Sequence, residues 1–292
     1  MKTIALIPAR YGSSRFPGKP LADLHGKPLI QRVYEQARKV SGLAAIYVAT
    51  DDERIRDCVL GFGGQALMTR SDHPSGSDRL AEAASLLGLN PLDVVVNVQG
   101  DQPLFPPHLV TYLAGLFEKD CSLVMATPAR RVTDTAQAAD PNVVKVVMDH
   151  RGLALYFSRS PIPYFRDGER PYFFRHIGIY AYRVDFLRTF VTLPPGRLEQ
   201  AEKLEQLRAL EYGFPIRVVE TNGDTLEVDT PEDLAFMREL FTRLGNKTDF
   251  TWYDVLEIVQ QHPELSQINA AVRHKTMTEV DERSKVESQK PS

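Results

Sequence analysis

Short, nearly continuous runs of apolar residues alternate along the chain with segments in which apolar residues recur every three or four positions. Three runs are almost entirely apolar: Thr3–Pro8, Ala45–Thr50 and Asp93–Gln99. Such runs are typical of strands buried on both faces of a parallel sheet. Apolar residues recur at helical spacing in the segments between these runs. These segments are Leu29–Val40, Asp52–Leu60 and Asp78–Leu87. Repeated strand–helix units of this kind predict an α/β fold with right-handed crossovers.

The middle of the chain predicts further strands. Asn142–Met148 and Leu153–Ser158 are two apolar runs joined by a turn at Arg151-Gly152. His176–Tyr182 predicts one more strand, which leads into a helix around Val184–Val191. A leucine-bearing helix is expected over Glu199–Tyr212.

Two helix starts carry capping signals. The segments Thr50–Glu53 and Thr230–Asp233 both fit a capping box, in which the threonine hydroxyl accepts a helix N–H. Proline at the first helical position supports the second start. The helix that follows it has Leu234, Met237 and Phe241 on one face.

Composition changes near Gly245. We expect a main domain over residues 1–244, a helical extension over 245–275, and a disordered tail over 276–292, which is polar and nearly without apolar residues. Within the extension, Trp252–Gln261 predicts one amphipathic helix.

Composition and charge exclude several classes of protein. Apolar residues make up 43% of the 292 residues, which is enough for a large core. A net charge of −3 is unusual for a nucleic-acid binder. Apolar runs are too short for a membrane helix, and the first apolar stretch is too short for a secretory signal. The two cysteines, Cys58 and Cys121, have no zinc-ligand spacing, so we expect reduced thiols and a cytoplasmic protein.

The loop after the first strand has the composition of a phosphate-binding loop. Residues 9–20 read ARYGSSRFPGKP, with small residues and two glycines that let backbone N–H groups approach an anion. Arg10, Arg15 and Lys19 add three cations that could clamp a triphosphate. The pattern matches neither the Walker loop nor the dinucleotide-binding fingerprint, which disfavours a dehydrogenase. An ordinary loop with solvated cations is the alternative.

Two aspartates are candidates for a metal site. Asp101 follows the third buried strand, at the edge of the sheet where ligands bind in open α/β folds. Asp229 lies between a strand and the capped helix. Mg²⁺ is commonly held by one or two carboxylates together with substrate phosphates. The alternatives are a turn cap for Asp101 and compensation of a helix dipole for Asp229.

A fourth motif, Asp72–Arg79, opens a predicted helix with hydroxyls and a flexible glycine. These groups suit recognition of a polar ring or a sugar. Capping of the helix by Ser77 is the simpler interpretation of the same residues, and it is compatible with the first.

Together these blocks resemble the cytidylyltransferases that activate 3-deoxy-D-manno-octulosonate (Kdo). The similarity runs through about residues 1–243, in ordered blocks that include IPAR and SRFPGKP near the start, SGSDRLAE, NVQGDQP, VKVV, ALYFSR, RHIGIY, LEQ to LEQLR, and VDTPED. The ALYFSR and RHIGIY blocks are what favour this branch over other sugar nucleotidyltransferases. Two departures stand out: the family commonly has Glu where Gln102 stands, and its chains usually end near residue 245.

The resemblance implies a nucleotide-diphospho-sugar transferase-like fold, a Rossmann-like, mixed and mostly parallel sheet flanked by helices, with a smaller sugar-binding and dimerisation subregion. It implies the reaction of CTP with Kdo to give CMP-Kdo and diphosphate, for lipopolysaccharide or capsule biosynthesis, in a homodimer that uses Mg²⁺. No covalent intermediate is needed, so catalysis should consist of positioning and charge neutralisation.

The resemblance also assigns roles to residues. The catalytic residues are Arg10, Arg15, Lys19, Asp101 and Asp229, of which Asp101 and Asp229 hold the metal. The nucleotide-binding residues are Pro8, Arg10, Ser13, Ser14, Lys19, Ser75, Gly76, Arg79 and Gln99. The sugar-binding residues are Gln99, Arg159, His176, Tyr180, Glu205 and Gln206, where the Arg159 fork would suit a carboxylate.

Three alternatives remain open. The same chemistry could act on 8-amino-3,8-dideoxy-manno-octulosonate, or on a sialic-acid-like sugar, which the Tyr156–Arg159 and His176–Tyr180 blocks fit less well. A non-catalytic nucleotide-binding protein on the same fold is the third, because fold does not determine function. The presence of Arg15, Lys19, Asp101 and Asp229 argues against it.

Overall fold

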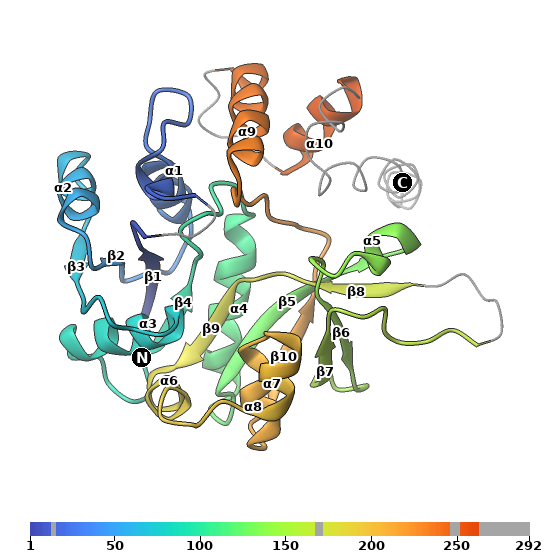
Figure 1. The fold of residues 1–292 in the computed structure, drawn as a ribbon. Helices are drawn as coiled ribbons and strands as arrows, with labels where there is room; N and C mark the ends of the chain where they lie inside the picture. The colour runs from blue at the N-terminus through green and yellow to red at the C-terminus, as the bar shows by residue number, and fades with distance from the viewer. Residues whose placement is uncertain (13–15, 167–171, 246–251, 263–292) are drawn as a thin grey trace, which may run out of the picture.

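A ten-stranded mixed sheet forms the centre of the protein (Figure 1). The computed structural model describes residues 1–292 except 13–15, 167–171, 246–251 and 263–292. The strands are β1 (Thr3–Ala9), β2 (Ala45–Thr50), β3 (Ala66–Met68), β4 (Val94–Asn97), β5 (Met125–Val132), β6 (Lys145–Met148), β7 (Ala154–Ser158), β8 (Phe173–His176), β9 (Tyr180–Arg183) and β10 (Ile216–Glu220). The helices are α1 (Leu29–Ala37), α2 (Glu53–Gly61), α3 (Gly76–Leu86), α4 (Pro107–Lys119), α5 (Thr135–Ala139), α6 (Val184–Phe190), α7 (Arg197–Glu202), α8 (Gln206–Glu211), α9 (Pro231–Leu244) and α10 (Trp252–Gln261), with a 3₁₀ turn η1 (Lys19–Leu21).

The sheet runs in the order β3-β2-β1-β4-β9-β5-β8-β6-β7, and β10 pairs with β5. Strands β1 to β4 are parallel where they pair with one another, and β10 is parallel to β5. Strand β9 is antiparallel to both of its neighbours, β4 and β5, and β8 is antiparallel to β5 and β6. The parallel part therefore gathers the carboxyl ends of β1 and β4 at one edge, where the candidate residues of the first two motifs lie.

Both faces of the parallel part are buried, as its continuous apolar runs predict. In β4, Val94 and Val96 pack into one apolar layer and Val95 into the other, and none of the three is exposed. Helices α1, α2 and α4 contribute to the first layer, and α3, α6 and α8 to the second. The predicted fold class is thus confirmed, and β2 and α10 have the bounds that the sequence predicts.

The predicted strand His176–Tyr182 is wrong, because the structure divides this segment between two strands. Strand β8 ends at His176 and β9 begins at Tyr180. Between them Ile177 donates its N–H to the Pro128 carbonyl at 3.0 Å, and Ile179 donates to Ile177 at 2.8 Å. The alternating pattern continues across Gly178, so the turn leaves no mark in the hydrophobic periodicity.

The predicted helix Glu199–Tyr212 is also two helices. Lys203 follows α7 in the left-handed conformation, with φ of 55°, which ends that helix. Leu204 then donates to the Glu199 carbonyl at 3.3 Å, and α8 starts at Gln206. Lysine seldom adopts this conformation, so composition gives no warning of the break.

One of the two predicted capping boxes is correct. Thr230 caps α9, with its hydroxyl accepting from the Asp233 N–H at 3.2 Å, and the Asp233 carboxylate accepts in return from the Thr230 N–H at 2.9 Å. Helix α2 is capped by Asp52 instead of Thr50, because the Asp52 carboxylate accepts from the Arg54 N–H at 2.9 Å.

Cys58 and Cys121 are free thiols. No helix in the described part of the chain has the length and apolar character that crossing a bilayer requires. The predicted disordered tail, residues 276–292, lies outside the described residues.

Candidate active site

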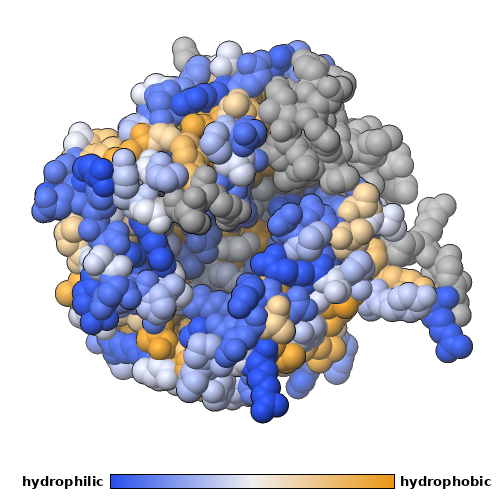
Figure 2. All heavy atoms as spheres, viewed as in Figure 1, coloured by the Kyte–Doolittle hydropathy of each residue, from blue (hydrophilic) through white to orange (hydrophobic). Residues whose placement is uncertain are grey.

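The end of β1 and the turn after β4 approach each other closely. A Cβ atom on Gly100 would lie 2.6 Å from the Pro8 carbonyl oxygen, so only glycine fits there without a shift of the backbone. This contact brings Asp101 next to the loop that follows β1. A space-filling view shows this face of the molecule hollowed near its centre, with polar side chains around the hollow (Figure 2).

Lys19 brings the two candidate carboxylates together. Its Nζ lies 2.8 Å from Asp101 Oδ2 and 3.4 Å from Asp229 Oδ1, although the two aspartates are far apart in the sequence. The Lys19 side chain is 12% exposed, whereas those of Asp101 and Asp229 are 28% and 32% exposed. Each carboxylate therefore keeps an open side from which a cation or a phosphate-bound metal can approach. We call these three residues the acid–lysine cluster.

Backbone hydrogen bonds hold the acid–lysine cluster in place. Gly18, in the left-handed conformation at φ 73°, donates to the Tyr11 carbonyl at 2.8 Å and starts the 3₁₀ turn that carries Lys19. The segment before Asp229 runs antiparallel to the one after Asp101, with Val228 donating to the Asp101 carbonyl at 2.9 Å. The cap on α9 then fixes the backbone directly after Asp229.

Glu227 adds a third carboxylate beside the cluster. Gln102, which is buried, donates from Nε2 to Glu227 Oε1 at 2.8 Å. The Glu227 residue is exposed, but the protein packed around its carboxyl and the negative charge of Asp101 raise the pKa of that carboxyl. Sequence reasoning missed Glu227, but it stands two residues before Asp229 in a segment where Leu226 and Val228 are buried. Because buried Leu226 and Val228 alternate with Glu227 and Asp229, the sequence could have placed Glu227 on the same side of this segment as Asp229.

The loop after β1 is described in part. Arg10 is exposed, and Pro8 is half-buried. Tyr11 stacks under the Arg54 guanidinium, which lies 3.3 Å from the ring centre. The predicted residues Ser13, Ser14 and Arg15 lie outside the described part of the chain.

Ser75, not Ser77, caps α3. Its hydroxyl accepts from the Asp78 N–H at 3.2 Å and donates to the Asp78 carboxylate at 2.6 Å. Ser77 instead donates to Glu205 Oε2 at 3.0 Å, which ties the start of α3 to α8. Gly76 has room for a Cβ, since the nearest atom would be a Pro8 carbon at 3.9 Å.

Arg79 does not reach the surface, contrary to its predicted role at the cytidine. Its guanidinium is fully buried, and it donates to Thr69 Oγ1 at 2.5 Å and to Asp51 Oδ2 at 3.0 Å. A buried and paired arginine of this kind joins the ends of β2 and β3 behind the helix. The helical spacing of apolar residues does not reveal that Arg79 is buried, because a charged residue next to the buried Leu80 would usually be expected at the surface.

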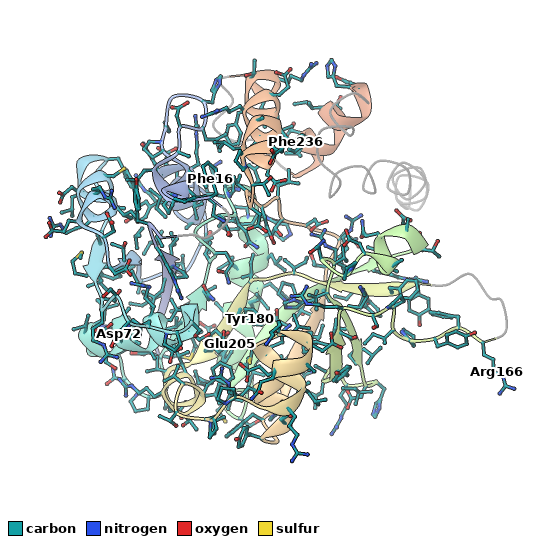
Figure 3. All side chains as sticks on the ribbon, in the orientation of Figure 1. Phe16, Asp72, Arg166, Tyr180, Glu205 and Phe236 are labelled. Atoms are coloured by element: carbon teal, nitrogen blue, oxygen red, sulfur yellow. The ribbon has the colours of Figure 1, made fainter. Side chains whose placement is uncertain are left out.

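Four of the predicted sugar-side residues lie together near β9 and α8. The His176 and Tyr180 rings are 5.2 Å apart, and Figure 3 shows Tyr180 next to Glu205. Burial and the neighbouring Arg175 charge lower the pKa of His176 to about 3, so its ring is neutral at physiological pH. The His176 Nε2 lies 2.9 Å from Thr127 Oγ1. Gln206 is buried at the start of α8.

Gln99 and Arg159 are both engaged with backbone carbonyls. Gln99 donates to the Gly178 carbonyl at 3.4 Å. Arg159 donates from Nε to the Glu202 carbonyl at 2.7 Å and from Nη1 to the Pro141 carbonyl at 2.8 Å. The guanidinium of Arg159, whose shape suits a carboxylate, thus has two of its N–H donors bound to main-chain oxygens.

Among the buried acceptor atoms without a hydrogen-bond partner within the described residues, three belong to residues of this region or its neighbourhood. They are Asn97 Oδ1, Gln102 Oε1 and Glu205 Oε1. Asn97 lies opposite Tyr180 in the β4–β9 register, so it shares a face with that ring. Buried acceptors without a donor are costly, and a ligand rich in hydroxyl groups would satisfy them.

Glu205 is expected to make the protein less stable at high pH. Burial raises the pKa of its carboxyl above the usual value. A carboxyl with a raised pKa favours the folded state at low pH, and this contribution is lost as the pH rises through the folded-state pKa. Glu205→Gln should therefore raise the Tm by about 2 °C at pH 8 and leave it unchanged at pH 4. Calorimetry of Glu205→Gln and of Glu53→Gln, which changes an exposed carboxyl, tests this; equal behaviour of the two would contradict it.

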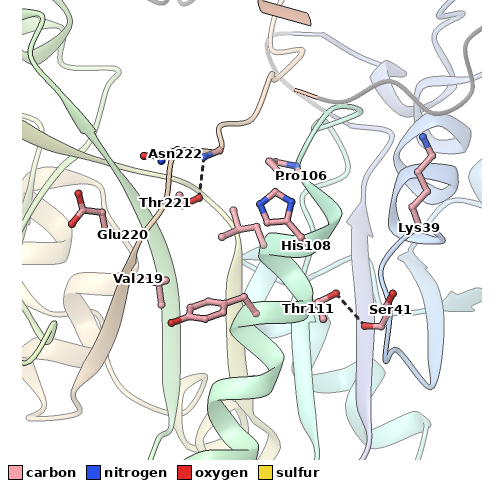
Figure 4. Close-up of a pocket in the computed structure, with 12 residues that line it drawn as sticks. Lys39, Ser41, Pro106, His108, Thr111, Val219, Glu220, Thr221 and Asn222 are labelled. Atoms are coloured by element: carbon pink, nitrogen blue, oxygen red, sulfur yellow. Dashed lines mark hydrogen bonds between the residues drawn. The ribbon is translucent and has the colours of Figure 1, made fainter. Parts of the chain in front are cut away.

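A separate cavity of about 830 Å³ lies between α4 and the end of β10 (Figure 4). Its lining includes Lys39, His108 and Asn222, and Thr111 donates to the Ser41 carbonyl at 3.2 Å on one side of it. None of the residues of the acid–lysine cluster lines this cavity, so the two features are distinct.

A model of the cytidylyltransferase family matches residues 4–221. The chain belongs to that family. A 3-deoxy-manno-octulosonate cytidylyltransferase of Syntrophobacter fumaroxidans is 55% identical to this cytidylyltransferase over 236 residues, which cover 80% of this chain and 94% of the relative. An 8-amino-3,8-dideoxy-manno-octulosonate cytidylyltransferase of Shewanella sp. is also 55% identical, over 80% of this chain and 96% of its own.

Solved structures agree with the fold of this cytidylyltransferase. A CMP:2-keto-3-deoxy-manno-octonic acid synthetase complexed with CTP is 47% identical, with a TM-score of 0.79, and the match covers 84% of this chain and all of the other. A cytidylyltransferase from Leptospira borgpetersenii is 16% identical with a TM-score of 0.64, covering 91% of this chain and 96% of its own, and this likeness concerns the fold alone.

Proposed function

We propose that this cytidylyltransferase transfers CMP from CTP to Kdo, forming CMP-Kdo and diphosphate for lipopolysaccharide or capsule biosynthesis. The observation that carries the proposal is the acid–lysine cluster at the carboxyl end of the parallel strands, where Lys19 joins Asp101 and Asp229. The relatives named for Kdo activation and the similar structure with CTP support it. Catalysis on this geometry consists of positioning and charge neutralisation.

In the proposed reaction the anomeric hydroxyl oxygen of Kdo attacks the α-phosphorus of CTP in line. A new P–O bond forms, the bond to the β-phosphate breaks, and the hydroxyl proton is released to water. Lys19, whose ammonium already lies at the carboxylates, stabilises negative charge on the phosphates and the departing diphosphate. Exposed Arg10 lies on the same loop and provides a second cation.

The acid–lysine cluster fits Mg²⁺. Two carboxylates with open sides converge on one point, which is the protein ligand set that Mg²⁺ usually takes beside substrate phosphates. No group of three or more His, Cys, Asp or Glu side chains in the described residues forms a closed metal cage. Asp101 and Asp229 would hold the ion. When bound, Mg²⁺ supplies Lewis-acid chemistry at the α-phosphate.

The cytidine side is proposed to lie between the β1 loop and the start of α3, where Pro8 approaches Gly76. Ser75 fixes that turn through Asp78, so the backbone around Gly76 is held for contact with the nucleotide. Ser13, Ser14 and Arg15 remain proposed contacts to the nucleotide. Buried Arg79 would act by supporting this helix and not by touching the base.

The sugar side is proposed to lie at Gln99, His176, Tyr180, Glu205 and Gln206. The unsatisfied oxygens of Asn97, Gln102 and Glu205 would accept hydrogen bonds from the hydroxyl groups of the sugar. Neutral His176 can donate or accept but does not supply a positive charge.

The 8-amino analogue of Kdo is the second candidate acceptor. One specific observation favours it, since relatives of equal identity are named for that sugar. The terminal ammonium group of this analogue would form charge-assisted hydrogen bonds with carboxylates of the site. A sialic-acid-like acceptor has no such support.

A homodimer is proposed as well. Tyr164 is 89% exposed, and Phe165 packs edge-on against Tyr172 and Phe173. The exposed rings of Tyr164 and Tyr172 at this position suit an interface. We also propose a cytoplasmic location, because Cys58 and Cys121 are free thiols and the cosubstrate is CTP.

Release of diphosphate tests the proposal. Purified protein with CTP, Mg²⁺ and Kdo should release diphosphate and form CMP-Kdo, and omission of any of the three should stop it. Parallel reactions with 8-amino-Kdo and with sialic acid rank the acceptors by kcat/KM. No release with any of these sugars would reject the proposed function.

A further inference from the structure

A third apolar cluster adjoins the chain segments that carry the acid–lysine cluster. It packs α9 against side chains that neighbour each of the three residues in sequence. Its buried members are Leu24, Leu29, Leu104, Leu226, Val228, Leu234, Phe236, Met237, Leu240, Phe241, Leu244 and Val255, with Phe16, Ala22 and Ile258 packed at its margin. Figure 3 shows Phe16 and Phe236 on the same side of the molecule, toward α1 and α9.

The chain segments that carry Lys19, Asp101 and Asp229 all rest on this cluster. Leu104 follows Asp101, and Leu226 and Val228 precede Asp229. Leu226 donates to the Leu104 carbonyl at 3.0 Å, so the segment before Asp229 is also joined to the segment after Asp101 through the backbone. The Arg238 side chain on α9 donates to the Asp23 carbonyl at 2.9 Å, which ties the loop after Lys19 to the same helix.

Helix α10 closes this cluster from outside. It lies beside α9 (Figure 1), and Val255 is only 2% exposed within the cluster, with Ile258 packed one turn further on. Beyond the end of α10, His262 contacts Arg243 of α9. Alignments that cover 94–99% of the relatives leave about a fifth of this chain unmatched, which is about the size of the segment 245–292.

We propose that α10 is a strut that positions the acid–lysine cluster, with Val255 as its positioning residue. The inference rests on the proposed function, because it concerns how this cluster binds CTP with its metal. Protein interiors are close-packed and transmit small shifts. A cavity left between α10 and α9 would let the segment before Asp229 move away from the segment after Asp101. Nucleotide binding would then weaken.

Val255→Ala tests the strut against two matched variants. Val255→Ile keeps the apolar contact, and Glu257→Ala changes an exposed side chain on the same helix. Calorimetric titration of CTP in the presence of Mg²⁺ gives the Kd, and steady-state assays give KM for CTP and for Kdo. We expect Val255→Ala to raise the Kd and KM of CTP about fivefold, with KM for Kdo unchanged. Both controls should match the wild type.

Several outcomes decide the matter. If Val255→Ala lowers the Tm but leaves the Kd of CTP unchanged well below the Tm, α10 only adds stability and the strut is rejected. Deletion of residues 246–292 gives a second measure, and an unchanged Kd there rejects it too. Because the titration needs no turnover, it tests the strut even where none of the sugars reacts, which would reject the proposed function separately.

Discussion

Asp101→Asn is expected to lower kcat about a thousandfold, or about 4 kcal/mol of transition-state stabilisation. The amide keeps the shape of the side chain but removes the charge that Lys19 contacts at 2.8 Å and that the proposed Mg²⁺ would share with Asp229. The Asp101 side chain is partly exposed, and its main-chain carbonyl still accepts from Val228 in the variant, so the fold should persist. Initial-rate assays at saturating CTP and Kdo measure the loss.

Asp57→Asn is the matched control, because Asp57 pairs with Arg56 at an exposed position on α2. It should retain full activity. Circular dichroism and the Tm of Asp101→Asn should agree with those of the wild type within a few degrees. An Asp101→Asn enzyme that turns over at the wild-type rate would show that Asp101 does not hold the catalytic cation.

Lys19→Met is expected to have opposite effects on two ligands. Loss of the ammonium should reduce kcat/KM for CTP about a thousandfold, because the phosphates lose a cation in a partly enclosed site. The same change leaves Asp101 and Asp229 without the ammonium that neutralises them. We therefore expect Mn²⁺, used as a probe for Mg²⁺, to bind about tenfold more tightly in the absence of CTP.

The two effects of Lys19→Met can be measured separately. Electron paramagnetic resonance gives the affinity for Mn²⁺, and diphosphate release gives kcat/KM. Lys27→Met, which removes an ion pair with Glu35 at a more exposed position, should change neither. Weaker Mn²⁺ binding in Lys19→Met would mean that lysine and metal do not compete for the same carboxylates.

Much of the parallel half of the fold is readable in the sequence because burial on both faces leaves an unbroken apolar run. Ala45–Thr50 is such a run, and β2 has these bounds. Where a single backbone torsion ends an element, the hydrophobic pattern does not show the break. Lys203 in the left-handed conformation divides a helix, and the turn at Gly178 divides a strand, although the hydrophobic spacing continues through both.

The site shows the same division. Asp101 follows β4, whose carboxyl end lies beside that of β1, so its place near the β1 loop could be expected. Asp229 follows no strand, since β10 ends at Glu220, and backbone hydrogen bonds from Leu226 and Val228 hold its segment beside Asp101. Which side a charged residue faces depends on packing against segments that are not adjacent to it in the sequence. Arg79 is thus buried against Asp51, and Asp224, unnoticed in the sequence, is buried between Arg130 and Arg175.

A crystal structure of the protein with CTP and Mn²⁺, collected for the anomalous signal of manganese, tests the central claim most directly. The account predicts a manganese peak within about 2 Å of a carboxylate oxygen of Asp101, a carboxylate oxygen of Asp229 and an α-phosphate oxygen. Lys19 should then have turned from the carboxylates to the phosphates. A manganese ion bound only by the triphosphate, or at carboxylates elsewhere, would contradict it.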